Sequence, residues 1–207
     1  MTETGRKTLT ENKFVITEHD QKLEQSVDSE MHFATILERE FSIKSEESIE
    51  RRLAHTHPKV LIIVGSAREN SNTLEAIKKL SPFSHYDLVD LRTSRIRPYA
   101  YNSGATADDD FLAIAIKMLH ADVIVFATPV YWYAMSTSMK LFFDRLTDLL
   151  GPYKSVGKRL KGKRVYVIAS GGQPTPPDGF EIPFRLTSEY FDMQFVETLY
   201  QQAEQTV

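Results

Sequence analysis

Short apolar runs alternate with helix-period segments from residue 59 onward, and this alternation constrains the fold more than any other feature. Five runs have the length and apolar or β-branched content of strands: residues 60–64, 86–91, 123–127, 165–169 and 194–199. Amphipathic or capped helix patterns lie between them at residues 72–80, 108–119, 135–149 and 180–191. Strands that alternate with helices form parallel sheets with right-handed crossovers. The sequence therefore predicts an α/β protein.

The spacing of the five strands favours a doubly wound, flavodoxin-like parallel sheet of order 2-1-3-4-5. In that topology the binding crevice lies at the carboxyl ends of strands one and three. A site is therefore expected in the loops that follow Val64, Ala127 and Ala169.

Composition divides the chain near Pro58. Residues 1–57 hold 8 basic and 12 acidic residues, whereas residues 58–207 are close to neutral. We expect an N-terminal, partly helical extension over 1–57 and one flavodoxin-like domain over 58–207. The overall net charge of -3 favours neither nucleic acid nor a membrane surface as a partner.

Other broad classes are excluded by residues that are missing. The chain has no Cys, so disulfides, Cys-ligated zinc and iron–sulfur clusters are ruled out. No His group has convincing metal-ligand spacing, and no metal site is expected. The N-terminus lacks the apolar core of a secretory signal, and no apolar run can span a bilayer. A soluble, cytoplasmic protein is the expectation.

The loop after the first strand, residues 65–73, has the features of an anion site. It lies between a buried strand and a helix N-terminus, where free N–H groups and the helix dipole favour negative charge. Its candidate binding residues are Ser66, Arg68, Ser71, Asn72 and Thr73. The loop lacks a Walker A motif and the glycine spacing of a dinucleotide fingerprint. A phosphate monoester on a cofactor therefore fits better than a nucleoside triphosphate, and an ordinary polar turn is the alternative.

Two further loops offer a ring site. The second, residues 128–134, carries three adjacent aromatics on which a flat conjugated ligand could stack, although a dimer interface is also rich in such residues. The third, residues 170–173, contains Gly171 and Gly172, which let backbone approach a ligand closely, and a plain turn is the alternative.

The motifs in these loops resemble those of the NAD(P)H-dependent FMN reductases, within the wider flavodoxin-like quinone and flavin reductase group. The resemblance covers about residues 58–200. It rests on residues 65–68 with 71–73, on 128–133 with Lys140, Asp144 and Arg145, and on 170–172.

This resemblance implies FMN as cofactor, NAD(P)H as electron donor and a homodimer. Carried over by position, the FMN phosphate would be held by Ser66, Arg68, Ser71, Asn72 and Thr73. The isoalloxazine would be lined by Pro129, Val130, Tyr131, Trp132 and Tyr133, and its pyrimidine edge by Ser170, Gly171 and Gly172. Flavin chemistry of this kind needs no acid–base side chain, so no catalytic residue is assigned. The acceptor would be a small molecule: a quinone, flavin, azo or nitro compound.

Two non-enzymatic alternatives stay open, a flavodoxin-type electron carrier and a flavin-binding sensor or interaction protein. A carrier benefits from carboxylates around the flavin, and residues 128–134 and 170–177 contain none. Cofactor electrostatics therefore favour the reductase.

We interpret two sets of charged residues as features of the protein surface. The basic residues between 154 and 164 are read as a solvated loop near a helix C-terminus, with steering of NADPH phosphates as the minority interpretation. Asp144 and Arg145 are read as a helix-surface or dimer ion pair.

The extension is expected to cover part of the sheet. The chain offers only eight residues after Leu199, too few for the helix that normally follows strand five, yet a parallel sheet needs both faces covered. We hypothesise that a helix within residues 30–54, with Phe33, Leu37 and Phe41 spaced four apart, covers that face in its own chain or in a dimer partner. A disordered acidic tail is the alternative for residues 1–28.

Overall fold

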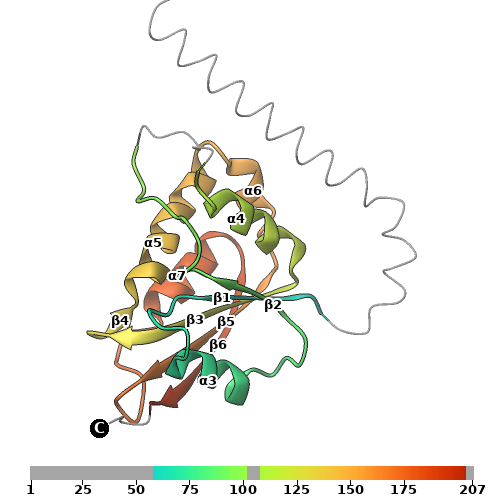
Figure 1. Cartoon of the computed structure of the whole chain (residues 1–207). Helices are drawn as coiled ribbons and strands as arrows, with labels where there is room; N and C mark the ends of the chain where they lie inside the picture. The colour runs from blue at the N-terminus through green and yellow to red at the C-terminus, as the bar shows by residue number, and fades with distance from the viewer. Residues whose placement is uncertain (1–57, 102–107, 204–207) are drawn as a thin grey trace, which may run out of the picture.

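A computed structural model describes residues 58–101 and 108–203 of the chain. A six-stranded sheet forms its centre, with helices on both faces (Figure 1). The strands are β1 (Val60–Val64), β2 (Asp87–Asp90), β3 (Val123–Tyr131), β4 (Ala134–Met135), β5 (Arg164–Gly171) and β6 (Gln194–Gln202). The helices are α3 (Asn72–Leu80), α4 (Phe111–His120), α5 (Thr137–Arg145), the 3-10 helix η1 (Leu146–Leu150), α6 (Lys154–Lys158) and α7 (Ile182–Tyr190). No helix of the described ranges is long and apolar enough to cross a membrane.

Five of the strands run parallel, in the order β2-β1-β3-β5-β6, and β4 pairs antiparallel with β3 beside this row. Because the two-residue β4 takes a number of its own, this is the predicted order 2-1-3-4-5. The prediction of a flavodoxin-like α/β fold is confirmed.

The apolar run of β1 is continuous because both of its faces are buried. Leu61 and Ile63 belong to the core under α4, α5 and α7, whereas Ile62 and Val64 belong to the core under α3. A strand between two helical layers needs apolar side chains at every position.

The two faces of the sheet carry unequal helical layers. Helices α4, α5, α6 and α7 pack on the side of the larger core, where aromatic rings meet, for example Phe126 and Phe184 with centroids 6.2 Å apart. In the described part of the chain, α3 is the one helix on the opposite face, as Figure 1 shows below the sheet.

The long helix expected over residues 135–149 is wrong in its bounds. Residues 134–135 pair with β3, and the helix starts only after Ser136, whose Oγ accepts a hydrogen bond from the Met139 amide at 3.3 Å. The chain then tightens at Leu146 into η1. Tertiary pairing with β3 outweighs the helical pattern at the start of this segment.

Both surface interpretations of charged residues need correction. Asp144 pairs with Lys140 at 2.5 Å on the helix surface, whereas Arg145 is buried and contacts other carboxylates. The basic stretch is not a loop throughout, because residues 154–158 form α6. Its Lys163 is half-buried and donates to the carbonyls of Leu119 and Ala121 at the end of α4, at 2.8 and 2.5 Å. Burial lowers the pKa of Lys163.

The proposed helix within residues 30–54, and the extension as a whole, lie outside the described residues. Its role stays a prediction.

Candidate functional site at the carboxyl edge of the sheet

Three loops from distant parts of the sequence are tied together at the carboxyl ends of β1, β3 and β5. The Gly65 amide donates to the Ala127 carbonyl at 2.8 Å, and Ser136 Oγ donates to the Gly65 carbonyl at 2.6 Å. The hydroxyls of Thr73 and Ser170 lie 3.0 Å apart in a buried hydrogen bond. These bonds fix the three loops relative to one another, so they form one edge.

The first loop ends in a capped helix. Ser71 is the N-cap of α3, and its Oγ accepts from the Leu74 amide at 3.3 Å. Upstream, Ser66 Oγ accepts from the Arg68 amide at 3.3 Å and so holds the loop in a tight turn. The first N–H groups of a helix have no partner within that helix. The start of α3 therefore presents donors and the positive end of its dipole to this edge.

The candidate phosphate residues differ in exposure. Ser66, Ser71 and Thr73 are buried, Asn72 is half-buried, and Arg68 is exposed. Thr73 already uses its hydroxyl toward Ser170. The loop thus combines buried polar side chains with one exposed cation, Arg68.

The second loop is a tight hairpin turn. β3 pairs with β4 through Val130 with Met135 and Tyr131 with Ala134, which leaves two residues at the turn. These are Trp132 and Tyr133, with φ of 48° and 67°. Both positions of such a turn favour glycine or asparagine. Two bulky aromatics in this conformation store strain of about 1–2 kcal/mol each.

The turn aromatics point away from the core. Trp132 is 92% exposed and Tyr133 72% exposed. Strain and the exposure of large apolar side chains both act against stability, and such features concentrate at binding sites, so this turn is a candidate part of one. Pro129, in contrast, is buried within β3 opposite Ser170, and Val130 is half-buried.

A small cavity of about 200 Å³ joins the second and third loops. It is lined by Val130, Trp132, Tyr133, Gly171, Gly172, Gln173, Pro177 and Tyr200. The two glycines have different surroundings. A Cβ on Gly171 would lie 2.7 Å from the Tyr200 hydroxyl, whereas a Cβ on Gly172 would meet nothing within 4 Å. Gly171 is therefore required by packing, and Gly172 leaves open space in front of its backbone.

Tyr200 is a residue of this edge that sequence reasoning missed. It lies on β6, beyond the predicted end of that strand, and its hydroxyl donates to the Gln173 carbonyl at 2.9 Å. Burial raises the pKa of Tyr200. Its position in a polar C-terminal stretch gave no signal, because only the pairing of β6 with β5 brings it to the cavity.

Gln173 and Pro177 also line the cavity without having been predicted. Their proximity to the glycine pair in sequence was the available signal.

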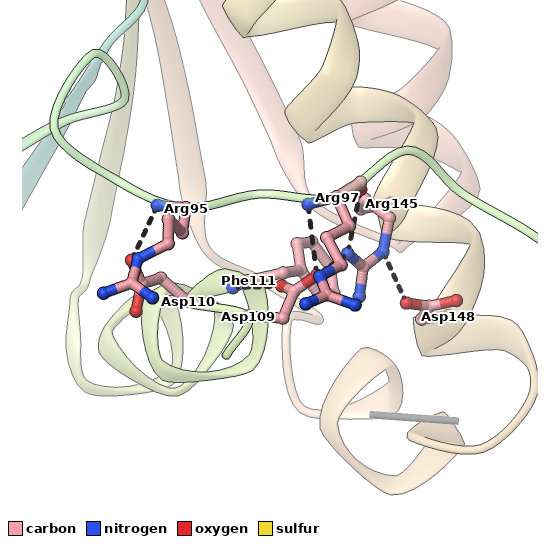
Figure 2. Close-up of polar contacts among 7 residues, drawn as sticks. All are labelled: Arg95, Arg97, Asp109, Asp110, Phe111, Arg145 and Asp148. Atoms are coloured by element: carbon pink, nitrogen blue, oxygen red, sulfur yellow. Dashed lines mark hydrogen bonds and ion pairs between the residues drawn. The ribbon is translucent and has the colours of Figure 1, made fainter. Parts of the chain in front are cut away.

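A charged cluster is formed by residues outside the three loops, around Arg145 (Figure 2). Arg145 is buried, pairs with Asp109 and with Asp148 at 2.8 Å, and donates to the Arg97 carbonyl at 3.0 Å. Its guanidinium also lies 4.8 Å from the centre of the Phe111 ring. The cluster fastens the segment before α4 to the end of α5.

Opposing effects set the pKa of Asp109. Burial alone raises it, but hydrogen bonds from Arg145 and from the amides of Phe111 and Arg97 outweigh burial, so the pKa lies below its usual value. For Arg145, burial lowers the pKa, and the two carboxylates more than reverse that effect. The cluster is charged at neutral pH. Within the described ranges no group of three or more metal-ligating side chains occurs, here or elsewhere.

Comparison with known proteins identifies related chains. The family model described as NADPH-dependent FMN reductase matches residues 58–200. YwqN of Bacillus subtilis (strain 168), provisionally named an NAD(P)H-dependent FMN-containing oxidoreductase, is 30% identical over 121 residues, which cover 55% of this chain and 67% of YwqN.

Solved structures share the fold. The Trp repressor binding protein from Bacillus subtilis has a TM-score of 0.56 and 26% identity, covering 71% of this chain and 88% of that one. General stress protein 14 from Treponema denticola, solved in complex with FMN, has a TM-score of 0.52 and 21% identity, covering 72% and 88%.

Proposed function

The chain belongs to the NADPH-dependent FMN reductase family, and from this premise we propose that its three-loop edge binds FMN and passes two electrons from NAD(P)H to a small acceptor. The acceptor class is a quinone, a flavin, or an azo or nitro compound. The observation that carries the proposal is that the Thr73–Ser170 bond joins an anion-type helix start to the glycine loop, which shares a cavity with the strained aromatic turn.

The start of α3 fits a phosphate monoester. Its free amides and the Asn72 side chain are donors, and Arg68 can close over the anion from the rim. Ser66 and Ser71 hold the backbone of this loop in place: Ser66 Oγ accepts from the Arg68 amide and donates to the Arg68 carbonyl, and Ser71 Oγ accepts from the Leu74 amide.

The aromatic turn and the glycine loop fit the two sides of a flat ring. Tyr131, Trp132 and Tyr133 supply an exposed aromatic surface, and the open space before Gly172 admits a ring edge to the backbone. Bound FMN would supply the hydride chemistry itself. The chain's own residues orient the ring, exclude water from one side and offer backbone N–H groups to developing negative charge.

An absorbance spectrum of the purified protein, repeated anaerobically after addition of NADPH, tests this function. A flavin band that bleaches directly to the fully reduced form is the expected result. A flavin band that NADPH leaves unchanged would contradict the reductase and favour a carrier or sensor. Absence of flavin even after incubation with FMN would contradict the cofactor site.

A homodimer completes the proposal. Ile182, Leu186 and Tyr190 are exposed and lie four residues apart on α7, so this helix is apolar on its outer side as well as its buried one. Arg185 and Glu189 flank the stripe as a pair at 2.9 Å. If the same helix of a second copy packed antiparallel on this one, the two apolar stripes would be in contact. Arg185 of each copy would then lie near Glu189 of the other, as a two-fold interface requires.

Leu186→Asp should weaken the dimer by roughly 30-fold or more in Kd, because it places a charge at the centre of the apolar stripe. Sedimentation velocity over a concentration series measures this. Ala113→Asp, on the exposed side of α4, is the control and should leave the association state unchanged. A monomeric wild-type protein at all concentrations would contradict the interface.

A cytoplasmic location stays a prediction.

A further inference from the structure

A large groove lies at the opposite end of the sheet from the three loops. Its volume is about 800 Å³, and we call it the β2 groove. It is lined by Pro58, Lys59, Val60, Leu61, Ser84, His85, Tyr86, Asp87, Lys117, His120 and Ala121. The carboxyl-edge cavity is formed by different residues. The function proposed above therefore leaves this groove without a role.

Strand β2, beside the groove, is covered on one face only. Val89 is buried in the core under α4, whereas Leu88 is 43% exposed and Tyr86 38% exposed. Leu88 pairs in register with Ile62, which faces α3, so Leu88 belongs to the α3 face of the sheet. α3 itself packs mainly over β3, β5 and β6. The α3 face thus ends in exposed apolar side chains over β2.

Two lysine side chains border the groove. Lys59 and Lys117 are exposed, and neither is paired with a carboxylate in the part of the chain that the structure describes. The lining also includes one carboxylate, Asp87, and the Lys59 amide donates to a second, Asp122, at 2.9 Å. An occupant that combines apolar side chains with carboxylates would complement this surface.

We propose that residues 30–57 of the same chain occupy the β2 groove and cover Leu88. Pro58 lines the groove, so the chain that precedes it starts from the groove wall. A segment tethered at the edge of its own docking surface binds at high effective concentration and needs little intrinsic affinity.

The sequence of this segment matches the surface. Its apolar residues recur at helical spacing, with Phe33, Leu37 and Phe41 four apart, followed by Ile49 and Leu53, also four apart. It is net acidic, because its six glutamates outnumber its four basic residues: Glu30, Glu38, Glu40, Glu46, Glu47 and Glu50 against Arg39, Lys44, Arg51 and Arg52. In the groove the apolar residues contact Tyr86 and the carboxylates face Lys59 and Lys117; around the edge of β2, on the α3 face, further apolar residues cover Leu88.

Carboxyl-to-amine zero-length cross-linking of the full-length protein, followed by peptide mapping, tests the docking. The expected product joins a glutamate of residues 30–50 to Lys117. Lys79, an exposed lysine on α3, is the reference amine and should give no such product. A mixture of isotope-labelled and unlabelled protein separates links within one chain from links between two.

Two variants sharpen the test. Leu37→Asp with Phe41→Asp should abolish the link to Lys117, because the segment loses its apolar contact. Val15→Asp, outside the docking segment, should leave the link intact. Links that are spread equally over Lys79 and Lys117, or that join only different chains, would overturn the proposal.

Discussion

Ser71 combines two roles at the residue scale, as the cap of α3 and as part of the proposed phosphate site. Ser71→Ala removes the bond to the Leu74 amide and should lower the free energy of unfolding by about 1 kcal/mol. It should also raise the Kd for FMN, because the backbone donors lose their fixed orientation. Urea unfolding and flavin-fluorescence titration measure the two effects.

Ser81→Ala at the other end of α3 is the matched control. Its Oγ bonds only the backbone around Phe83 in the described part of the chain. It should leave the Kd for FMN unchanged. An equal change of Kd in both variants would argue against the phosphate site.

The adjacent glycines should respond in opposite ways. Gly171→Ala forces a Cβ against Tyr200 and Val130, at 2.7 and 3.1 Å, and should destabilise the protein by about 1–3 kcal/mol. Gly172→Ala meets no atom and should change stability by less than about 0.5 kcal/mol. Gly172→Ala should nevertheless weaken FMN binding if the ring edge approaches that backbone. Thermal unfolding with and without FMN separates the two cases.

Asp109 should contribute a pH-dependent part of stability. Its pKa is lowered by folding, so its stabilising effect is complete above the unfolded pKa of about 3.9 and is lost as the pH falls through the lower folded value. Asp109→Asn should lower the free energy of unfolding at pH 7 by about 2 kcal/mol. As the pH falls below 5, the free energy of unfolding of the Asp109→Asn variant should decrease less steeply than that of the wild type.

Urea unfolding across a pH series measures this slope. Asp108→Asn, at an exposed carboxylate, should keep the wild-type slope. Arg145→Met leaves two carboxylates buried without their cation, and it should destabilise at pH 7 by about 3–5 kcal/mol. Parallel slopes in wild type and Asp109→Asn would rule out this role for Asp109.

At the scale of elements, the β3–β4 hairpin is strained at Trp132 and Tyr133, and it exposes both aromatic rings. Trp132→Asn with Tyr133→Gly installs residues that prefer positive φ, so stability without ligand should rise by about 1 kcal/mol. FMN affinity should fall, since the stacking rings are gone. Tyr131→Thr, in extended backbone, is the control and should weaken FMN binding without any gain in stability. A stabilised variant with unchanged FMN affinity would contradict the ring site.

β3 leaves one of its neighbours shortly before the hairpin. β1 stops pairing with β3 at Ala127, two residues before Pro129. Proline has no N–H to donate, so it suits the point at which a central strand leaves one neighbour. The strand then continues beside β5 and turns back at Trp132.

At the scale of the whole molecule, the sheet has one thick helical layer and one thin one. Helices α4, α5 and α7 pack on the larger core, whereas in the described part of the chain α3 is the one helix that covers the other face. A parallel sheet is stable only when both faces are covered. Because the α3 face has the thinner layer, docking of residues 30–57 in the β2 groove should add cover where the sheet has least.

Local patterns in the sequence were enough for the strands, their order and the three loops. The short length and β-branched content of the continuous apolar runs indicate buried strands, and the N-cap serine of α3 can be read directly from the sequence. The division of residues 134–150 into β4, α5 and η1 could not be read in this way. Neither could the burial of Arg145, because its partner Asp109 lies 36 residues away.

The sequence by itself determined the parallel α/β fold and the edge where polar and aromatic loops converge, because strand and helix periods are local and the loops after parallel strands share one edge. The strand order followed from the doubly wound topology that this alternation favours. Only the tertiary structure decided that Thr73 bonds to Ser170, that Tyr200 closes the cavity, and that Gly171 is packed while Gly172 is open. Those facts depend on contacts between segments up to about a hundred residues apart, and such contacts leave no periodic trace in a single sequence.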